Sequence, residues 1–140
     1  ADILGNKGVE VHTALPWITV ADAAKRLTDA EVGALVVCDA DRRIRGIVSE
    51  RDIVRALRTS SDLMKTQVSA VMTRNVTTVA PDVTVAEAMA MMTKLRHRHL
   101  PVMENGKLIG VVSIGDLVKH RVAEMEMENV VLRDAAIARY

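Results

Sequence analysis

The chain has 140 residues, 49% of them hydrophobic, and its 19 basic and 18 acidic side chains give a formal net charge of +1. This size suits one compact unit, and the near-neutral charge disfavours binding to nucleic acid or to anionic membrane surfaces. No apolar run approaches the roughly 20 residues that span a bilayer. Trp17 and Tyr140 are the aromatic residues, so we expect an aliphatic core. The single cysteine, Cys38, leaves no intramolecular disulfide and favours a reducing, cytoplasmic location.

The first half of the chain carries a β-α-β-β-α pattern. After a short strand, apolar residues recur at helical spacing from Val20 to Leu27, and Thr19 with Asp22 fits a capping box at the start of this helix. Two apolar runs separated by a polar turn then predict a β-hairpin, and a second helix follows. The strands are expected at residues 11–13, 34–38 and 44–48.

The same pattern returns in the second half of the chain. Residues 11–23 align with residues 76–88 at an offset of 65, and residues 46–55 align with 110–119 at an offset of 64. One extra residue in the first hairpin turn explains the change of offset. We therefore predict an α/β (α+β) fold of two β-α-β-β-α repeats, each too small to bury its sheet alone, packed about a pseudo-two-fold axis. The expected divisions are residues 8–66, 67–122 and a helical extension at 123–140.

One long helix is predicted from Asp116 to about Ala138. Its apolar residues exceed the needs of one small domain and stand between charged ones, which suggests packing on a second subunit. The alternative is a solvated, partly frayed tail. The apolar residues concerned are Val118, Val122, Met125, Val130 and Leu132.

Both hairpins end in the same tetrad. Ser49 with Asp52, and Ser113 with Asp116, place a hydroxyl and a carboxylate three residues apart after a Gly-apolar-apolar entry, where a strand gives way to a helix. A helix N-terminus attracts phosphate, and an Asp carboxylate suits the paired hydroxyls of a ribose. The same Ser-x-x-Asp spacing also lets a helix cap itself. The spacing leaves a ligand site and a simple cap both open.

The repeated unit and its tetrads resemble tandem CBS-domain pairs (Bateman modules), over residues from about Gly8 to Lys119. In that family the cleft between the repeats commonly holds AMP, ADP, ATP, NAD or S-adenosylmethionine. The resemblance implies that Asp52 and Asp116 accept from ribose hydroxyls and that Ser49 and Ser113 contact ribose or phosphate. It also implies adenine contacts near the first strand and the start of the hairpin in each copy. The candidates for these contacts are Val11, Thr13, Gly33, Ala34 and Thr78.

The basic run around Arg98 and His99 has no counterpart in the first copy. It is similar to the His-Arg-Leu-Pro-Val run that contacts nucleotide phosphate in the γ subunit of AMP-activated protein kinase, which implies phosphate contacts here. The alternative is a solvated helix end, where cations meet the negative pole of the helix dipole. A metal site at His97 and His99 is disfavoured because no third ligand lies nearby in the sequence.

These features predict a regulatory module with no catalytic activity. Cys38 is expected to be buried, and neither serine motif has a nearby histidine to activate it. An adenosine-containing ligand, AMP or ATP before NAD or S-adenosylmethionine, is expected to alter a homodimer that a separate partner protein reads. The alternative is a ligand-independent, dimeric protein–protein interaction module.

Overall fold

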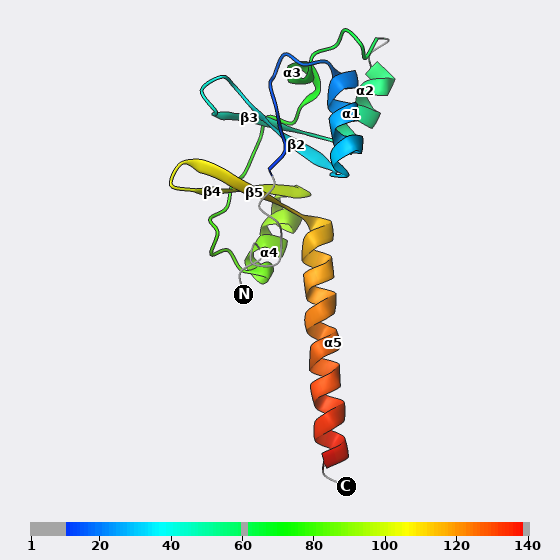
Figure 1. Cartoon of the computed structure of the whole chain (residues 1–140), viewed down its shortest axis with the longest axis vertical. Coiled ribbons are helices and arrows are strands. Elements are labelled where there is room, and N and C mark those ends of the chain that lie inside the picture. Colours follow the sequence, from blue (N-terminus) through cyan, green and yellow to red (C-terminus); the bar gives the residue numbers. More distant parts are fainter. Residues whose placement is uncertain (1–10, 60–61, 139–140) are drawn as a thin grey trace. The chain divides into compact units, whose positions relative to one another are not determined.

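The computed structural model describes residues 11–59 and 62–138, with side chains described as far as Asn129. Contacts divide this part of the chain into two compact units, and we call them the first repeat, which ends at Thr77, and the second repeat, which begins at Thr78. Each repeat combines a small sheet with helices (Figure 1), so the α/β (α+β) class predicted from the sequence is confirmed.

The first repeat contains a three-stranded sheet in the order β1-β2-β3. Strand β1 runs parallel to β2, and β2 pairs antiparallel with β3 in the predicted hairpin. Strand β1 begins two residues later than predicted, and it ends at Ala14, two residues before Pro16, which has no amide N–H to continue a ladder. The elements are β1 (Thr13–Ala14), α1 (Val20–Ala30), β2 (Ala34–Cys38), β3 (Ile44–Ser49), α2 (Glu50–Thr59) and α3 (Val68–Val71).

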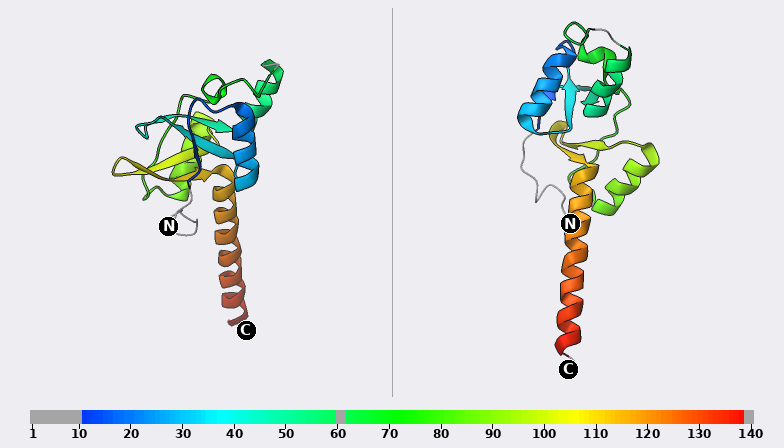
Figure 2. Two further views of the ribbon diagram at one scale, coloured as in Figure 1. Left: turned by 45° about the horizontal axis from the view of Figure 1, so that its top comes forward. Right: turned by 90° about the vertical axis from the view of Figure 1, so that its right-hand side faces the viewer.

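The second repeat contains the antiparallel pair β4-β5. In place of β1, Val79 forms a parallel bridge to Val102, and its N–H donates to the Pro101 carbonyl at 2.9 Å. At the repeat offset of 65, the first strand is expected at residues 76–78, and the structure has the Val79 bridge one residue later instead. The elements are α4 (Val85–Leu95), β4 (His99–Glu104), β5 (Lys107–Ser113) and α5 (Ile114–Ala138), which Figure 2 shows from two further sides.

The helix caps repeat between the two copies. Thr19 and Thr84 each accept a 3.1 Å hydrogen bond from the backbone N–H three residues later, as the capping pattern predicts. Helices α1 and α4 both end at a residue in the left-handed conformation, Glu31 with φ 56° and Arg96 with φ 58°. The backbone therefore carries the sequence repeat even where the side chains differ.

The hairpin turns account for the change in sequence offset. Cys38 pairs with Ile44 in the first repeat, whereas Met103 pairs with Leu108 in the second, so the first turn is one residue longer. The register is irregular at the equivalent step in both hairpins, after Val37 and after Val102. The predicted extra residue is confirmed, and the hairpin tip absorbs it.

The segment after α2 returns to the first repeat. The Val68 N–H donates to the Ile18 carbonyl at 2.8 Å, and Thr73 pairs with Ile47 through backbone bonds of 2.8 and 2.9 Å. Helix α3 and this return were not predicted from the sequence. Residues 67–77 belong to the second repeat in the sequence-based division, but in the structure they cluster with the first.

Gly46 lies on β3 where the returning segment packs against the strand. A Cβ atom at this position would lie 2.7 Å from the Thr73 carbonyl oxygen and 2.8 Å from the Met72 sulfur. We expect Gly46→Ala to lower the free energy of unfolding by about 1–3 kcal/mol, because a backbone atom must move. Urea denaturation followed by the fluorescence of Trp17, the single tryptophan, measures this loss.

Gly115, in the first turn of α5, offers the matched control. A Cβ atom there meets the Ser113 hydroxyl at 3.7 Å, an ordinary contact. Gly115→Ala is expected to leave stability unchanged or raise it by up to about 1 kcal/mol through helix propensity. Equal destabilisation by both substitutions would contradict the proposed close packing at Gly46.

Each repeat has its own buried cluster. The first is built around Ala23, Leu35, Val48 and Val68, and the second around Ala88, Leu100, Val112 and Leu117. The members are aliphatic or Met, as the composition predicts. Among helices in the described ranges, none is both long and apolar enough to span a bilayer.

Candidate functional site

The carboxylate of Asp52 is enclosed by the first repeat. One oxygen, Oδ2, accepts from the Ser49 backbone N–H at 2.8 Å and from the Ser49 hydroxyl at 3.0 Å. The other, Oδ1, accepts from the Thr73 hydroxyl at 3.0 Å and from Arg55 at 3.4 Å. The residue is 3% exposed. A buried carboxylate needs such partners, and these protein donors engage both of its oxygens.

Asp116 occupies the equivalent place in the second repeat in a different environment. Its Oδ2 accepts from the Ser113 N–H at 3.1 Å, and the Ser113 hydroxyl accepts from the Asp116 N–H at 3.1 Å. This reciprocal pair caps α5. Asp116 is half-buried, whereas Asp52 is buried. The two tetrads therefore share the capping geometry but differ in how far the carboxylate is exposed.

The structure brings the predicted residues of each tetrad next to the start of the opposite strand. In the second repeat His99 is the register partner of Ser113, and the Ile114 N–H donates to the Arg98 carbonyl at 2.9 Å. In the first repeat Ala34 is the partner of Ser49, and the Glu50 N–H donates to the Gly33 carbonyl at 3.1 Å. In each repeat, the start of the first hairpin strand and the start of the following helix therefore meet at one corner. This corner lies at β2 and α2 in the first repeat and at β4 and α5 in the second.

The basic run divides between two elements. Arg96 is the C-cap of α4, and the His97 N–H donates to the Met92 carbonyl at 3.1 Å, so both belong to the helix end. Arg98 follows as an exposed residue, and His99 begins β4 half-buried. The helix-end alternative therefore fits Arg96 and His97, and the tetrad corner contains Arg98 and His99. Within the described ranges, no group of three or more His, Cys, Asp or Glu residues has an arrangement that could hold a metal ion.

The residues predicted to contact adenine lie beside the first strand of each repeat. Thr13 is exposed in β1, Val11 is half-buried just before it, and Thr78 is exposed just before the Val79 bridge. Arg26 of α1 donates to the Thr13 carbonyl at 3.3 Å. A surface hollow is found on this side of the first repeat. Its lining residues are Val11, His12, Thr13, Arg26, Asp29, Ala30 and Leu35.

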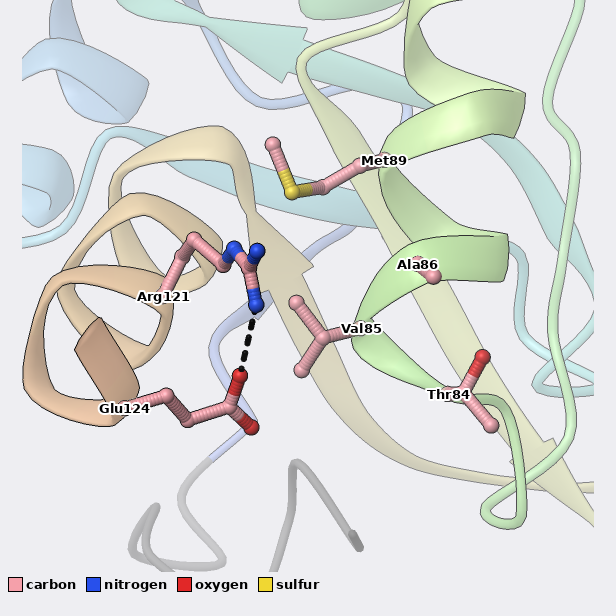
Figure 3. Close-up of a pocket in the computed structure, with 6 residues that line it drawn as sticks. All are labelled: Thr84, Val85, Ala86, Met89, Arg121 and Glu124. Carbon is pink, nitrogen blue, oxygen red and sulfur yellow. Dashed lines mark hydrogen bonds and ion pairs between the residues drawn. The ribbon is translucent and has the colours of Figure 1, made fainter. Parts of the chain in front are cut away.

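A second hollow lies between α4 and α5 within the second repeat (Figure 3). Val85 and Met89 of α4 face Arg121 and Glu124 of α5, which form an ion pair of 3.3 Å. None of the predicted ligand residues lines it. We therefore do not assign the nucleotide to this hollow.

Thr73 is a site residue that the sequence did not indicate. It lies 21 residues after Asp52 and reaches the carboxylate because the chain returns to β3. The alignment contains one weak signal. At the repeat offset, the positions equivalent to Thr73 fall at Ile137 and Ala138, where the backbone continues as α5, so α5 does not make the return that brings Thr73 to Asp52.

Cys38 is half-buried, so the expectation of full burial was wrong. The residue ends β2, directly before a turn whose residues 40–43 are exposed. Burial, and secondarily the neighbouring Asp39 carboxylate, raise the pKa of the thiol. A raised pKa keeps the sulfur protonated near neutral pH, which is the opposite of an activated nucleophile.

Known proteins share this fold and motif. The family model described as "CBS domain" matches residues 11–59 and again residues 68–123. An uncharacterised 17.7 kDa protein from Acidianus ambivalens is 40% identical over 111 residues, 79% of this chain. The CBS domain-containing protein CBSX3, mitochondrial, of Arabidopsis thaliana is 37% identical over 137 residues, 91% of this chain. The matched regions span 66% of the length of each of these two relatives.

Solved structures agree with this assignment. The CBS-domain containing protein ATU1752 from Agrobacterium tumefaciens superposes with a TM-score of 0.80 at 42% identity, covering 85% of this chain and 90% of that one. The CBS domain pair of protein MJ0100, solved with 5'-methylthioadenosine and S-adenosyl-L-methionine, superposes with a TM-score of 0.76 at 26% identity, covering 85% and 98%. The repeats, their tetrads and these matches together show that the chain belongs to the CBS domain family.

Proposed function

We propose that this chain is a regulatory module that binds an adenosine-containing ligand at the tetrad of its second repeat. The observation that carries the proposal is the corner where Ser113, Asp116, Arg98 and His99 meet. It combines a half-buried carboxylate for ribose hydroxyls with the start of a long helix and an exposed cation for phosphate. The adenosyl ligands held by the related MJ0100 domain pair support the same ligand class. That the ligand lies between the two repeats stays a prediction.

The second repeat is favoured over the first because the Asp116 carboxylate is less buried than that of Asp52. A ribose must displace the Thr73 hydroxyl or Arg55 to reach Asp52, which is 3% exposed. Displacing them removes hydrogen bonds from a buried carboxylate, at a cost of about 1–3 kcal/mol for each bond that the ribose does not replace. Asp116 is half-buried, so a ligand reaches its carboxylate more easily. We therefore assign Asp52 and Ser49 mainly to holding the first repeat together.

Arg98 favours a phosphorylated ligand. Arg98 is exposed and precedes β4, its backbone carbonyl accepts from the Ile114 N–H next to Ser113, and Arg forms forked hydrogen bonds to phosphate. S-adenosylmethionine has a cationic sulfonium and no phosphate, so its carboxylate is the one group that it can offer to this residue. We propose AMP or ATP first and NAD next. Val11, Thr13, Gly33, Ala34 and Thr78 remain the proposed adenine contacts.

Thermal unfolding in the presence of ligands tests the proposal. The purified chain is heated with AMP, ADP, ATP, NAD, S-adenosylmethionine and 5'-methylthioadenosine in turn. A ligand present at 100 times its dissociation constant stabilises the folded state by about 2.7 kcal/mol, which shifts the midpoint by several degrees for a domain of this size. A shift with one or more of these compounds supports the proposal, and no shift with any of them contradicts it.

Arg98→Gln separates phosphate binding from nucleoside binding. We expect it to weaken AMP binding about tenfold, because a charge-assisted hydrogen bond contributes about 1.5 kcal/mol or more, and to leave adenosine binding unchanged. Isothermal titration of both ligands measures the difference. Arg96→Gln is the matched control, since Arg96 is also exposed but caps α4. Equal losses for AMP and adenosine would show that Arg98 does not contact phosphate.

The remaining parts of the proposal concern the oligomeric state, the protein partner, catalysis and the cellular location. We propose that the chain forms a homodimer, that ligand binding alters this homodimer, that a separate protein partner reads the change, and that the chain catalyses no reaction. The raised pKa of the Cys38 thiol and the enclosure of the Ser49 hydroxyl by Asp52 support the absence of catalysis. The free thiol of Cys38 favours a cytoplasmic location.

One observation favours a second candidate function, a ligand-independent interaction module. Both tetrads already make the hydrogen bonds of helix caps, which is sufficient reason for Ser and Asp at this spacing. In such a module the exposed Arg98 binds an acidic partner protein. The ligand experiment separates the two candidates, because only the first expects a thermal shift with a purified nucleotide.

A further inference from the structure

Helix α5 carries an apolar stripe that its own repeat leaves exposed. Leu117 packs into the core, but Val118, Val122 and Met125 on an adjacent face are 47–50% exposed. Figures 1 and 2 show the later half of α5 extending past α4 and the β4-β5 sheet. A helix without tertiary packing is marginally stable in water, so this extension needs a partner along its stripe.

The spacing of the stripe is that of a coiled coil. Val118, Val122, Met125 and Asn129 are separated by four, three and four residues, which is the alternation of d and a positions in a heptad. In the sequence the same alternation continues to Leu132 and Ala136. Ile114, 43% exposed, lies beside the stripe at a g position one turn earlier, and Gly115 occupies the a position there. A strict seven-residue repeat favours winding around another helix over packing on a flat surface.

Charge and polarity favour another copy of α5 as the second helix. With Val122 at an a position, Arg121 falls at g and Glu126 at e, on opposite edges of the stripe; both are exposed, and within its own chain Arg121 pairs with Glu124 at 3.3 Å. In a parallel, in-register pair each g residue lies near the e residue five positions later in the partner, so Arg121 meets Glu126 of the second copy. The sequence repeats this complementarity one heptad later with Glu128 and Arg133.

Asn129 supports the same arrangement. It occupies an a position in the stripe and is exposed in the single chain. A lone Asn at an a position pairs with its equivalent in a parallel dimer and fixes both register and strand number, at some cost in stability. The stripe thus has an element that selects two chains as well as apolar residues that bring them together.

We propose that two copies of this chain associate through α5 as a parallel, two-stranded coiled coil. The proposal rests on the homodimer included in the proposed function and specifies its contact. It assigns the homodimer to Val118, Val122, Met125 and Asn129. The nucleotide corner at Ser113 and Asp116 stands at the beginning of the same helix, so the proposed ligand site and the dimer contact share one element.

Two methionines provide matched variants for the test. Met125 lies in the stripe, whereas Met127 is 70% exposed and lies on the opposite side of the helix, at an f position. Sedimentation equilibrium of the full chain is expected to show a dimer. Met125→Glu is expected to raise its dissociation constant at least about 100-fold, because association then buries two carboxylates without partners. Met127→Glu is expected to leave the constant within about twofold, as surface substitutions usually do.

Charge reversal tests the parallel register. Arg121→Glu alone is expected to weaken the dimer by placing two acidic residues together, and the double variant Arg121→Glu with Glu126→Arg is expected to restore it. A wild-type monomer, a dimer that survives Met125→Glu, or a double variant that remains weakened would each overturn the proposal. If Leu57→Glu on the exposed face of α2 abolishes the dimer and Met125→Glu does not, the homodimer stands but its contact lies elsewhere.

The same variants test the ligand proposal separately from the dimer proposal. Thermal unfolding of Met125→Glu with AMP shows whether the nucleotide site works in a chain that does not dimerise. A retained shift together with a lost dimer supports both proposals. A lost dimer in a chain whose wild type shows no shift supports the coiled coil and overturns the nucleotide site.

Discussion

Replacing Asp116 with alanine is expected to weaken adenine-nucleotide binding about 100-fold while leaving the fold intact. The carboxylate is the proposed acceptor for two ribose hydroxyls, and hydrogen bonds to a charged group contribute about 1.5–3 kcal/mol each. The substitution also removes one side of the α5 cap, which is expected to cost about 1 kcal/mol of stability. Isothermal titration with AMP gives the affinity, and urea unfolding gives the stability.

The controls for this variant distinguish the two repeats. Asp52→Asn keeps the shape of the first carboxylate and one acceptor oxygen, so it alters the first tetrad with less damage than alanine. We expect it to leave AMP affinity within about threefold of wild type, which corresponds to less than 1 kcal/mol. Loss of binding in Asp52→Asn with full binding in Asp116→Ala would move the nucleotide to the first repeat.

Asp52→Ala is expected to be the most destabilising of the proposed substitutions, by about 2–4 kcal/mol. The change removes the acceptor for the Ser49 N–H and for the Thr73 hydroxyl, and so costs both a helix cap and the tie to the returning segment. The residue is buried, so water does not readily replace the lost acceptor. Urea denaturation followed by Trp17 fluorescence measures the loss.

Asp116→Ala serves as the comparison for this effect, because Asp116 occupies the equivalent tetrad and is half-buried where Asp52 is buried. Thr73→Val removes one donor to Asp52 and is expected to cost about 1 kcal/mol. If Asp52→Ala is no more destabilising than Asp116→Ala, the enclosure of Asp52 does not stabilise the first repeat. The reason for favouring the second tetrad as the ligand site would then be lost.

Most of the fold could be predicted because short-range patterns in the sequence determine most of its helices and both of its hairpins. Helices α1 and α4 follow from helical spacing and Thr caps, and the two hairpins follow from apolar runs on either side of polar turns. The repeat reinforced each prediction, since the same pattern had to arise twice. Helix α3 was missed because four residues carry no periodicity, and its place depends on distant bonds such as that from Val68 to Ile18.

The residues of the site could be predicted from the sequence, but the difference between the two repeats could not. The tetrads and the basic run at Arg98 are visible in the sequence, and the structure brings these residues to one corner in each repeat. The enclosure of Asp52 depends on Thr73, which reaches it through a long-range return of the chain. The two tetrads have the same Ser-x-x-Asp spacing, but the Asp52 carboxylate has a partner, Thr73, that belongs to neither tetrad.

The bond between Thr73 and Asp52 also couples two distant parts of the first repeat. Any event that draws the Asp52 carboxylate away must release Thr73, which is held on β3 just before the second repeat begins. By thermodynamic reciprocity, any strain that pulls Thr73 off β3 makes Asp52 easier to reach by the same free energy. The hydrogen bond between Thr73 and Asp52 thus links the exposure of Asp52, at the start of α2, to the pairing of Thr73 with β3.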